Sequence, residues 1–290
     1  MKTVILMGTL TGLLLFTGWV LGVTFGYDPT GTITIAFLIA MAINLVSYWY
    51  SDKIVLKMYK AKIVSENEYP KLHAMVSNLA FNANLPKPNI AIIPTETPNA
   101  FATGRNEENA VVAVTKGAFN LLSRDELEGV LGHELAHIKN RDMFISTFAA
   151  VMAGTIGYIG FMGRWMLWTR GSRRESGSLQ LIGFLLLVIF IPLAATMIRL
   201  AVSRAREYDA DYRGAKISGK PDALARALLR LESYSLKKPL KMGNPATANL
   251  FIVNPFKGES LLSLLSTHPS TKDRVRKLNE LAKRMGRPMI

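Results

Sequence analysis

Four long apolar stretches divide the chain and predict much of its organisation. They cover residues 4–25, 33–50, 143–162 and 179–200. Each is long enough to cross a bilayer as a helix. A turn at 27–31 joins the first two, so residues 1–50 are predicted to form a transmembrane helical hairpin. The last two predict a second hydrophobic hairpin over residues 143–202.

The polar regions between and after these stretches predict the two parts of one soluble domain, residues 51–142 and 203–290. Helical spacing of apolar residues and chain-breaking prolines give the first part a mixed α/β character. The expected elements are helices at 70–82, 221–234 and 271–285, strands at 90–93 and 110–115, and a turn-rich stretch at 99–104.

The segment 123–142 carries the clearest chemical signal. Ser123 and Glu126 form a capping-box pattern, which predicts the start of a helix. On that helix His133 and His137 stand four residues apart, so both imidazoles face the same side. This is the H-E-x-x-H pattern, in which two histidines bind Zn²⁺ and the glutamate, here Glu134, acts as the general base.

Composition narrows the choice of ligands. The chain has no cysteine and only four histidines, so a metal must be held by histidine and carboxylate. The net charge of +14 would suit nucleic acid, but no recognition module is present. Many basic residues flank the apolar stretches instead, which favours contact with anionic membrane lipids and no nucleic-acid partner.

A catalytic zinc site needs a third protein ligand, and Glu207 is the best candidate. His137 lies just before the third apolar stretch, and Glu207 lies just after the fourth. If these two stretches form a helical hairpin, its two ends bring His137 and Glu207 to the same side of the membrane. Asp211 lies one helical turn further on and is predicted to orient a ligand histidine. The alternative is that both acids pair with Arg204 and Arg206 on a solvated face.

The chain resembles the HtpX-type membrane zinc metalloproteases, relatives of the CaaX prenyl proteases. The resemblance rests on HELAH with IKNRD, NAFATG, SRAREYDAD and THPS, in this order over nearly the whole chain. It implies that one Zn²⁺ per chain is bound by His133, His137 and Glu207, with Glu134 as catalytic base. It also implies a role in the quality control of membrane proteins.

The resemblance extends to the fold and to further candidate residues. We expect a mainly α-helical membrane protein with a small β-sheet, two transmembrane helical hairpins and a gluzincin-like zinc protease domain. His268 and Arg274, in or near the matching tail segment, are candidates to stabilise the oxyanion. Peptide substrates are expected to add to an edge strand. That strand is formed by Ala110, Val111, Val112 and Ala113, unless these residues make an ordinary core strand.

Charge near the apolar stretches predicts the orientation. Lysines follow residue 50, whereas the 27–31 turn has none, so the N-terminus and the zinc helix are expected on the cytoplasmic side of the cell (inner) membrane. Four arginines between the last two apolar stretches oppose this orientation, because it would place a basic loop on the outer side of the membrane. Either the first hairpin fixes the orientation, or the second pair lies partly in the interface or against protein.

Two other classes of function compete with the protease. A non-catalytic membrane scaffold or chaperone with a degenerate site is opposed by the intact H-E-x-x-H pattern. A transporter or receptor is disfavoured because the apolar stretches lack carboxylates for an ion pathway.

Overall fold

The computed structural model describes residues 2–25, 27–142, 144, 204–237, 250–253 and 269–290. Apart from residue 144, the predicted second hairpin at 143–202 therefore lies outside the described residues, as does the candidate His268.

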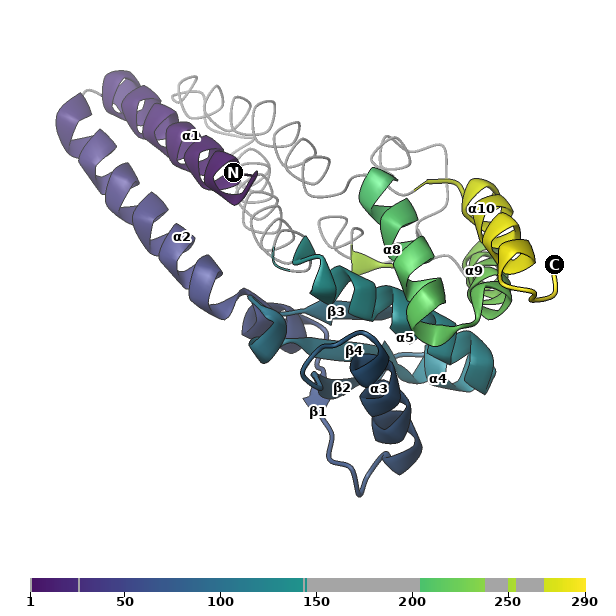
Figure 1. Ribbon diagram of the computed structural model, residues 1–290. Helices are drawn as coiled ribbons and strands as arrows, with labels where there is room; N and C mark the ends of the chain where they lie inside the picture. Colours follow the sequence, from purple (N-terminus) through teal and green to yellow (C-terminus); the bar gives the residue numbers. More distant parts are fainter. Residues whose placement is uncertain (1, 26, 143, 145–203, 238–249, 254–268) are drawn as a thin grey trace.

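Two long helices, α1 (Lys2–Phe25) and α2 (Pro29–Met58), form the predicted N-terminal hairpin and project from the rest of the described chain (Figure 1). Asp28 caps α2 by accepting hydrogen bonds from the backbone N–H groups of Thr30 and Gly31. Gly18 and Gly22 let the two helices approach closely, because a Cβ at either would lie within 2.7 Å of an atom of α2.

Within the described chain, one segment is long and apolar enough to cross a membrane, residues Pro29–Tyr50 of α2. The helix does not end there but continues without interruption to Met58. The boundary predicted at residue 50 thus falls inside α2, whose last turns dock on the sheet. Hydrophobicity marks where an apolar stretch ends, but not where a helix ends.

The sheet is small and mixed, with the strand order β1-β2-β4-β3. Strands β2 and β4 run parallel, whereas β1 and β3 are antiparallel to their neighbours. The strands are β1 (Lys62–Ile63), β2 (Asn89–Ile93), β3 (Ala100–Thr103) and β4 (Val111–Thr115).

Both faces of the sheet are covered, because alternate side chains of each strand point to opposite sides. One face, with Ile92 and Val112, packs into the main core with the helices. The other face, with Ile93 and Phe101, packs against Val55 near the end of α2. The helices are α3 (Pro70–Asn82), α4 (Lys116–Leu121), α5 (Arg124–Lys139), α8 (Arg204–Ser218), α9 (Pro221–Lys237) and α10 (Thr271–Arg284), with a short 3₁₀ turn, η1 (Glu107–Asn109).

The predicted mainly α-helical fold with a small sheet is confirmed, and the capping box of α5 forms as expected. Ser123 Oγ accepts from the backbone N–H of Glu126, and the Glu126 carboxylate accepts from the backbone N–H of Ser123.

Two predictions about the sheet are wrong. The stretch 99–104 contains strand β3 and not only turns. The residues predicted as a substrate edge, Ala110, Val111, Val112 and Ala113, are not an edge, because β4 is paired with β2 on one side and β3 on the other. The strand at 90–93 was predicted, but its neighbour β3 was hidden from sequence patterns because β3 is only four residues long and rich in alanine.

Candidate metal centre

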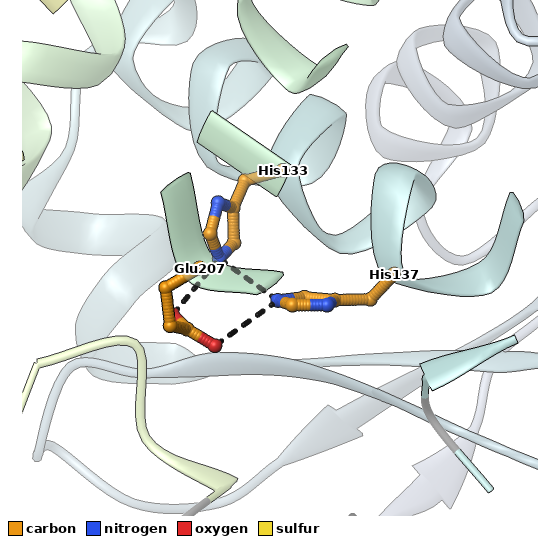
Figure 2. A group of neighbouring side chains, drawn as sticks. All are labelled: His133, His137 and Glu207. Carbon is orange, nitrogen blue, oxygen red and sulfur yellow. Dashed lines mark hydrogen bonds and ion pairs between the residues drawn. The ribbon is translucent and has the colours of Figure 1, made fainter. Parts of the chain in front are cut away.

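Helices α5 and α8 bring His133, His137 and Glu207 together, as Figure 2 shows. The two Nε2 atoms lie 3.2 Å apart. The Glu207 carboxylate oxygens lie 3.8 Å from Nε2 of His133 and 3.6 Å from Nε2 of His137. His133 and Glu207 are buried, and His137 is partly exposed. The residues predicted as ligands therefore meet at one point.

Two glycines allow the close approach of α5 and α8. A Cβ at Gly214 of α8 would lie 2.5 Å from the backbone nitrogen of His133, and one at Gly132 of α5 would lie 2.6 Å from the carbonyl oxygen of Gly214. Because backbone meets backbone here, the short Glu207 side chain can reach both imidazoles. Neither glycine was singled out from the sequence, since its role depends on a helix crossing.

Asp211 lies behind His133, next to the imidazole nitrogen that faces away from His137 and Glu207. Its Oδ1 is 3.0 Å from His133 Nδ1. Arg274 donates two hydrogen bonds to the Asp211 carboxylate, of 2.8 and 2.7 Å, and a third of 2.8 Å to the carbonyl of Ile252. Asp211 therefore lies beside a proposed ligand histidine, and it is also paired with a buried cation that the sequence did not indicate.

Arg274 does not fit the predicted role of oxyanion donor. Its side chain is buried, and its three donor nitrogens all bind Asp211 or Ile252. Its Nη1 lies 4.0 Å from Oε2 of Glu207. The pairing with Asp211 could not be read from the sequence, because the two residues lie on different helices.

A second carboxylate lies behind His137. Asp142 Oδ2 is 3.5 Å from His137 Nδ1, and Asp142 Oδ1 is 3.5 Å from Nη1 of Arg206. Sequence reasoning did not select Asp142. The signals available were its place five residues after His137, at the start of an apolar stretch, and its position as the last residue of the IKNRD segment. Arg206 pairs with Asp142, so the alternative in which it pairs with Glu207 or Asp211 on a solvated face does not hold.

Glu134 projects from α5 towards strand β3. Its Oε2 accepts a 2.9 Å hydrogen bond from the backbone N–H of Ala102. Burial raises the pKa of Glu134 to about 7, with the charge of Glu207 adding to the rise and that of His137 opposing it. A carboxyl group with a pKa near neutrality is well suited to accept and release a proton.

The pKa values of the two imidazoles are shifted in opposite directions when no cation is present. Burial lowers the pKa of His133, outweighing the contact with Asp211. Burial would also lower the pKa of His137, but Asp142 and the carboxylates of Glu207 and Glu134 outweigh it and raise this pKa to about 9. Burial opposes the charged form of Asp211 too, yet Arg274 lowers its pKa below the usual range.

Asn99 anchors a short segment beside the site. Its buried side chain accepts a hydrogen bond from the N–H of Ile252 and donates one to the carbonyl of Leu250, both of 3.2 Å. Because Arg274 binds the carbonyl of Ile252, residues 250–252 are held from two sides. The sequence marked Asn99 only as part of a turn-rich stretch.

Known proteins are similar to this chain over nearly its whole length. The model of peptidase family M48 matches residues 66–282. A protease HtpX homolog of Thermococcus sibiricus is 54% identical over 99% of this chain and 97% of its own length. Another, from Pyrococcus abyssi, is 53% identical over 98% of this chain and 96% of its own length.

A solved structure shares the fold. The crystal structure of S. mikatae Ste24p aligns with a TM-score of 0.50 and 21% identity, over 96% of this chain. The chain spans 65% of the length of that protein. The matched family model and the two highly similar relatives show that the chain belongs to peptidase family M48, among the HtpX-type proteases.

Proposed function

We propose that this protein is a membrane-embedded, zinc-dependent endopeptidase that cleaves membrane or misfolded proteins. The observation that carries the proposal is the convergence of His133, His137 and Glu207, with Glu134 beside them on the same helix. Membership of a peptidase family supports the reaction class.

The donor set fits zinc. Ligand atoms of a tetrahedral zinc site lie roughly 3.3 Å apart, because each is about 2.0–2.1 Å from the ion. The two Nε2 atoms are 3.2 Å apart, and the carboxylate oxygens approach them to 3.6 and 3.8 Å. Each histidine has a carboxylate next to its other ring nitrogen, which is the usual support for a ligand imidazole.

The chain's own residues then divide the work of peptide hydrolysis. When bound, a zinc ion supplies a Lewis acid that polarises the scissile carbonyl and makes water acidic. Glu134 takes the proton of the attacking water and hands it to the leaving amine. Burial keeps bulk water away from this carboxyl group and holds its pKa near neutrality.

The substrate backbone is proposed to pair with the outer edge of β3, and not with β4 as the sequence suggested. Among the described strands, β3 is paired on one side only. The N–H of Ala102 points away from β4, since it donates to Glu134. A peptide added to this side of β3 would run beside the base and the three ligands.

The membrane location is part of the proposal. The apolar segment of α2 spans residues 29–50, and Trp49 near its end stacks under the guanidinium of Arg105, which follows β3, at 4.8 Å. Aromatic residues at this point suit a membrane–water interface with lipid contacts. We propose a multi-pass protein of the cell (inner) membrane with its active site on the cytoplasmic side.

The test separates metal binding from proton transfer. In the full-length protein, Glu134→Gln should retain zinc but cleave casein or a fluorogenic peptide about 10²- to 10⁴-fold more slowly. Glu128→Gln, on the same helix but paired with Arg124 and Lys220, is the control and should keep both properties. Undiminished cleavage by Glu134→Gln would remove Glu134 as base, and absence of chelator-sensitive cleavage in the wild type would favour a non-catalytic scaffold.

A further inference from the structure

Asp142 reaches back to the metal centre because of an unusual turn at the end of α5. Arg141 adopts a left-handed conformation with φ of 57°, and its N–H donates to the carbonyl of Ile138. Few residues other than glycine take this conformation, so the turn is held by its surroundings. It directs the buried Asp142 carboxylate at Nδ1 of His137.

Arg206 provides the counter-charge for Asp142 from α8. Its Nη1 lies 3.5 Å from Asp142 Oδ1. Arg206 directly precedes Glu207, so the helix that presents the third proposed ligand also holds the carboxylate behind the second. A buried carboxylate without such a partner would be costly.

The same arrangement occurs on the other histidine, built from different elements. Asp211 lies behind His133 and is held by Arg274 of α10. We infer that Asp142 is a positioning residue for His137, held by Arg206, and that each ligand histidine is oriented by its own aspartate–arginine pair. This inference rests on the proposed zinc site.

A purely structural pair is the competing explanation. Asp142 precedes and Arg206 follows residues 143–203, so their contact could join two parts of the chain without affecting the metal. The two explanations differ in what they predict. A positioning residue fixes the imidazole, so that Nε2 faces the metal while Nδ1 donates to the carboxylate. A structural pair affects stability alone.

The experiment measures the metal directly and not only activity. Full-length wild type and variants in detergent would be titrated with Zn²⁺ in competition with a chromophoric chelator. The visible absorption of bound Co²⁺ would report the geometry of the site, and the melting temperature of the metal-free form would report folding. The variants are Asp142→Ala, Asp142→Asn, Arg206→Gln and Asp142→Ala with Arg206→Gln. The control, Arg213→Gln, breaks an aspartate–arginine pair on α8 whose aspartate forms no ion pair with a histidine among the described residues.

We expect Asp142→Ala to weaken Zn²⁺ binding roughly 10- to 100-fold and to change the Co²⁺ spectrum. Asp142→Asn should lose less Zn²⁺ affinity than Asp142→Ala, because its amide oxygen can still accept a hydrogen bond from Nδ1 of His137. Arg206→Gln should also weaken binding. The double variant should bind no more weakly than Asp142→Ala, because Arg206 acts through Asp142. Arg213→Gln should bind as the wild type does.

Unchanged zinc affinity and Co²⁺ spectrum in Asp142→Ala would overturn the inference, as would fully additive effects in the double variant. If Asp142→Ala does not fold, Arg206→Gln decides through its zinc affinity and Co²⁺ spectrum, and wild-type values for both overturn the inference. Failure of the wild type to bind zinc would instead overturn the proposed function.

Discussion

Arg274, on the last described helix, binds both carboxylate oxygens of Asp211 in the protein interior. Asp211 in turn lies 3.0 Å from His133. The C-terminal helix α10 is therefore connected to the metal centre through two side chains, although it supplies no ligand itself. Both partners are buried, so this ion pair is shielded from water.

Removal of Arg274 should destabilise the protein strongly. Arg274→Ala leaves the Asp211 carboxylate buried without its cation, which costs about 3–5 kcal/mol of the free energy of unfolding. Arg276→Ala on the same helix, which breaks an exposed pair with Asp273, should cost less than about 1 kcal/mol. Denaturant unfolding in detergent measures the free energy of unfolding of both variants. Equal losses would contradict the claim that Arg274 and Asp211 form a buried ion pair.

Gly214→Ala should separate α5 from α8. The new methyl group would lie 2.5 Å from the backbone nitrogen of His133, so the helices must move apart. We expect a loss of about 1–3 kcal/mol in stability and weaker zinc binding, because Glu207 retreats with α8. Gly12→Ala in α1, where a Cβ meets nothing within 4 Å, is the matched control. Wild-type zinc affinity in Gly214→Ala would refute the account of the crossing.

Asn99→Ala should release residues 250–252. The substitution leaves the N–H of Ile252 and the carbonyl of Leu250 without their partner, at a cost of about 1–3 kcal/mol for each group that stays buried. Asn109→Ala, on an exposed turn, should be nearly neutral. Thermal unfolding measures both, and an equally small effect at Asn99 would show that it is not an anchor.

Zinc binding should release a proton near pH 7. In the metal-free protein the pKa of His137 is about 9, so its imidazole is protonated at neutral pH and must lose that proton to bind the ion. Affinity should therefore rise with pH up to about 9 and level off above it. Calorimetric titration in buffers of different ionisation enthalpy counts the protons, and zero release near pH 7 would contradict the raised pKa.

The sequence was sufficient for those parts of the site that are local or chemically distinctive. The spacing of His133 and His137 and the capping box at Ser123 depend on helix geometry alone. Glu207 could be selected because the chain has no cysteine and because Glu207 follows the fourth apolar stretch as His137 precedes the third.

The rest depends on contacts between distant segments. The assignment of the edge strand failed because pairing partners are not encoded in the alternation of one strand. Arg274 was given the wrong role because its partner, Asp211, lies on another helix. Asp142 and Gly214 act only where α5 and α8 meet, so their roles could not be derived from their own sequence neighbourhood.

Zinc quantitation on purified full-length protein, wild type against Glu207→Ala, tests the central claim most directly. We predict about one zinc ion per chain in the wild type and a large loss in Glu207→Ala, because only two imidazole ligands remain. Equal zinc content in the two proteins, with cleavage unchanged, would contradict the assignment of His133, His137 and Glu207 as one metal centre.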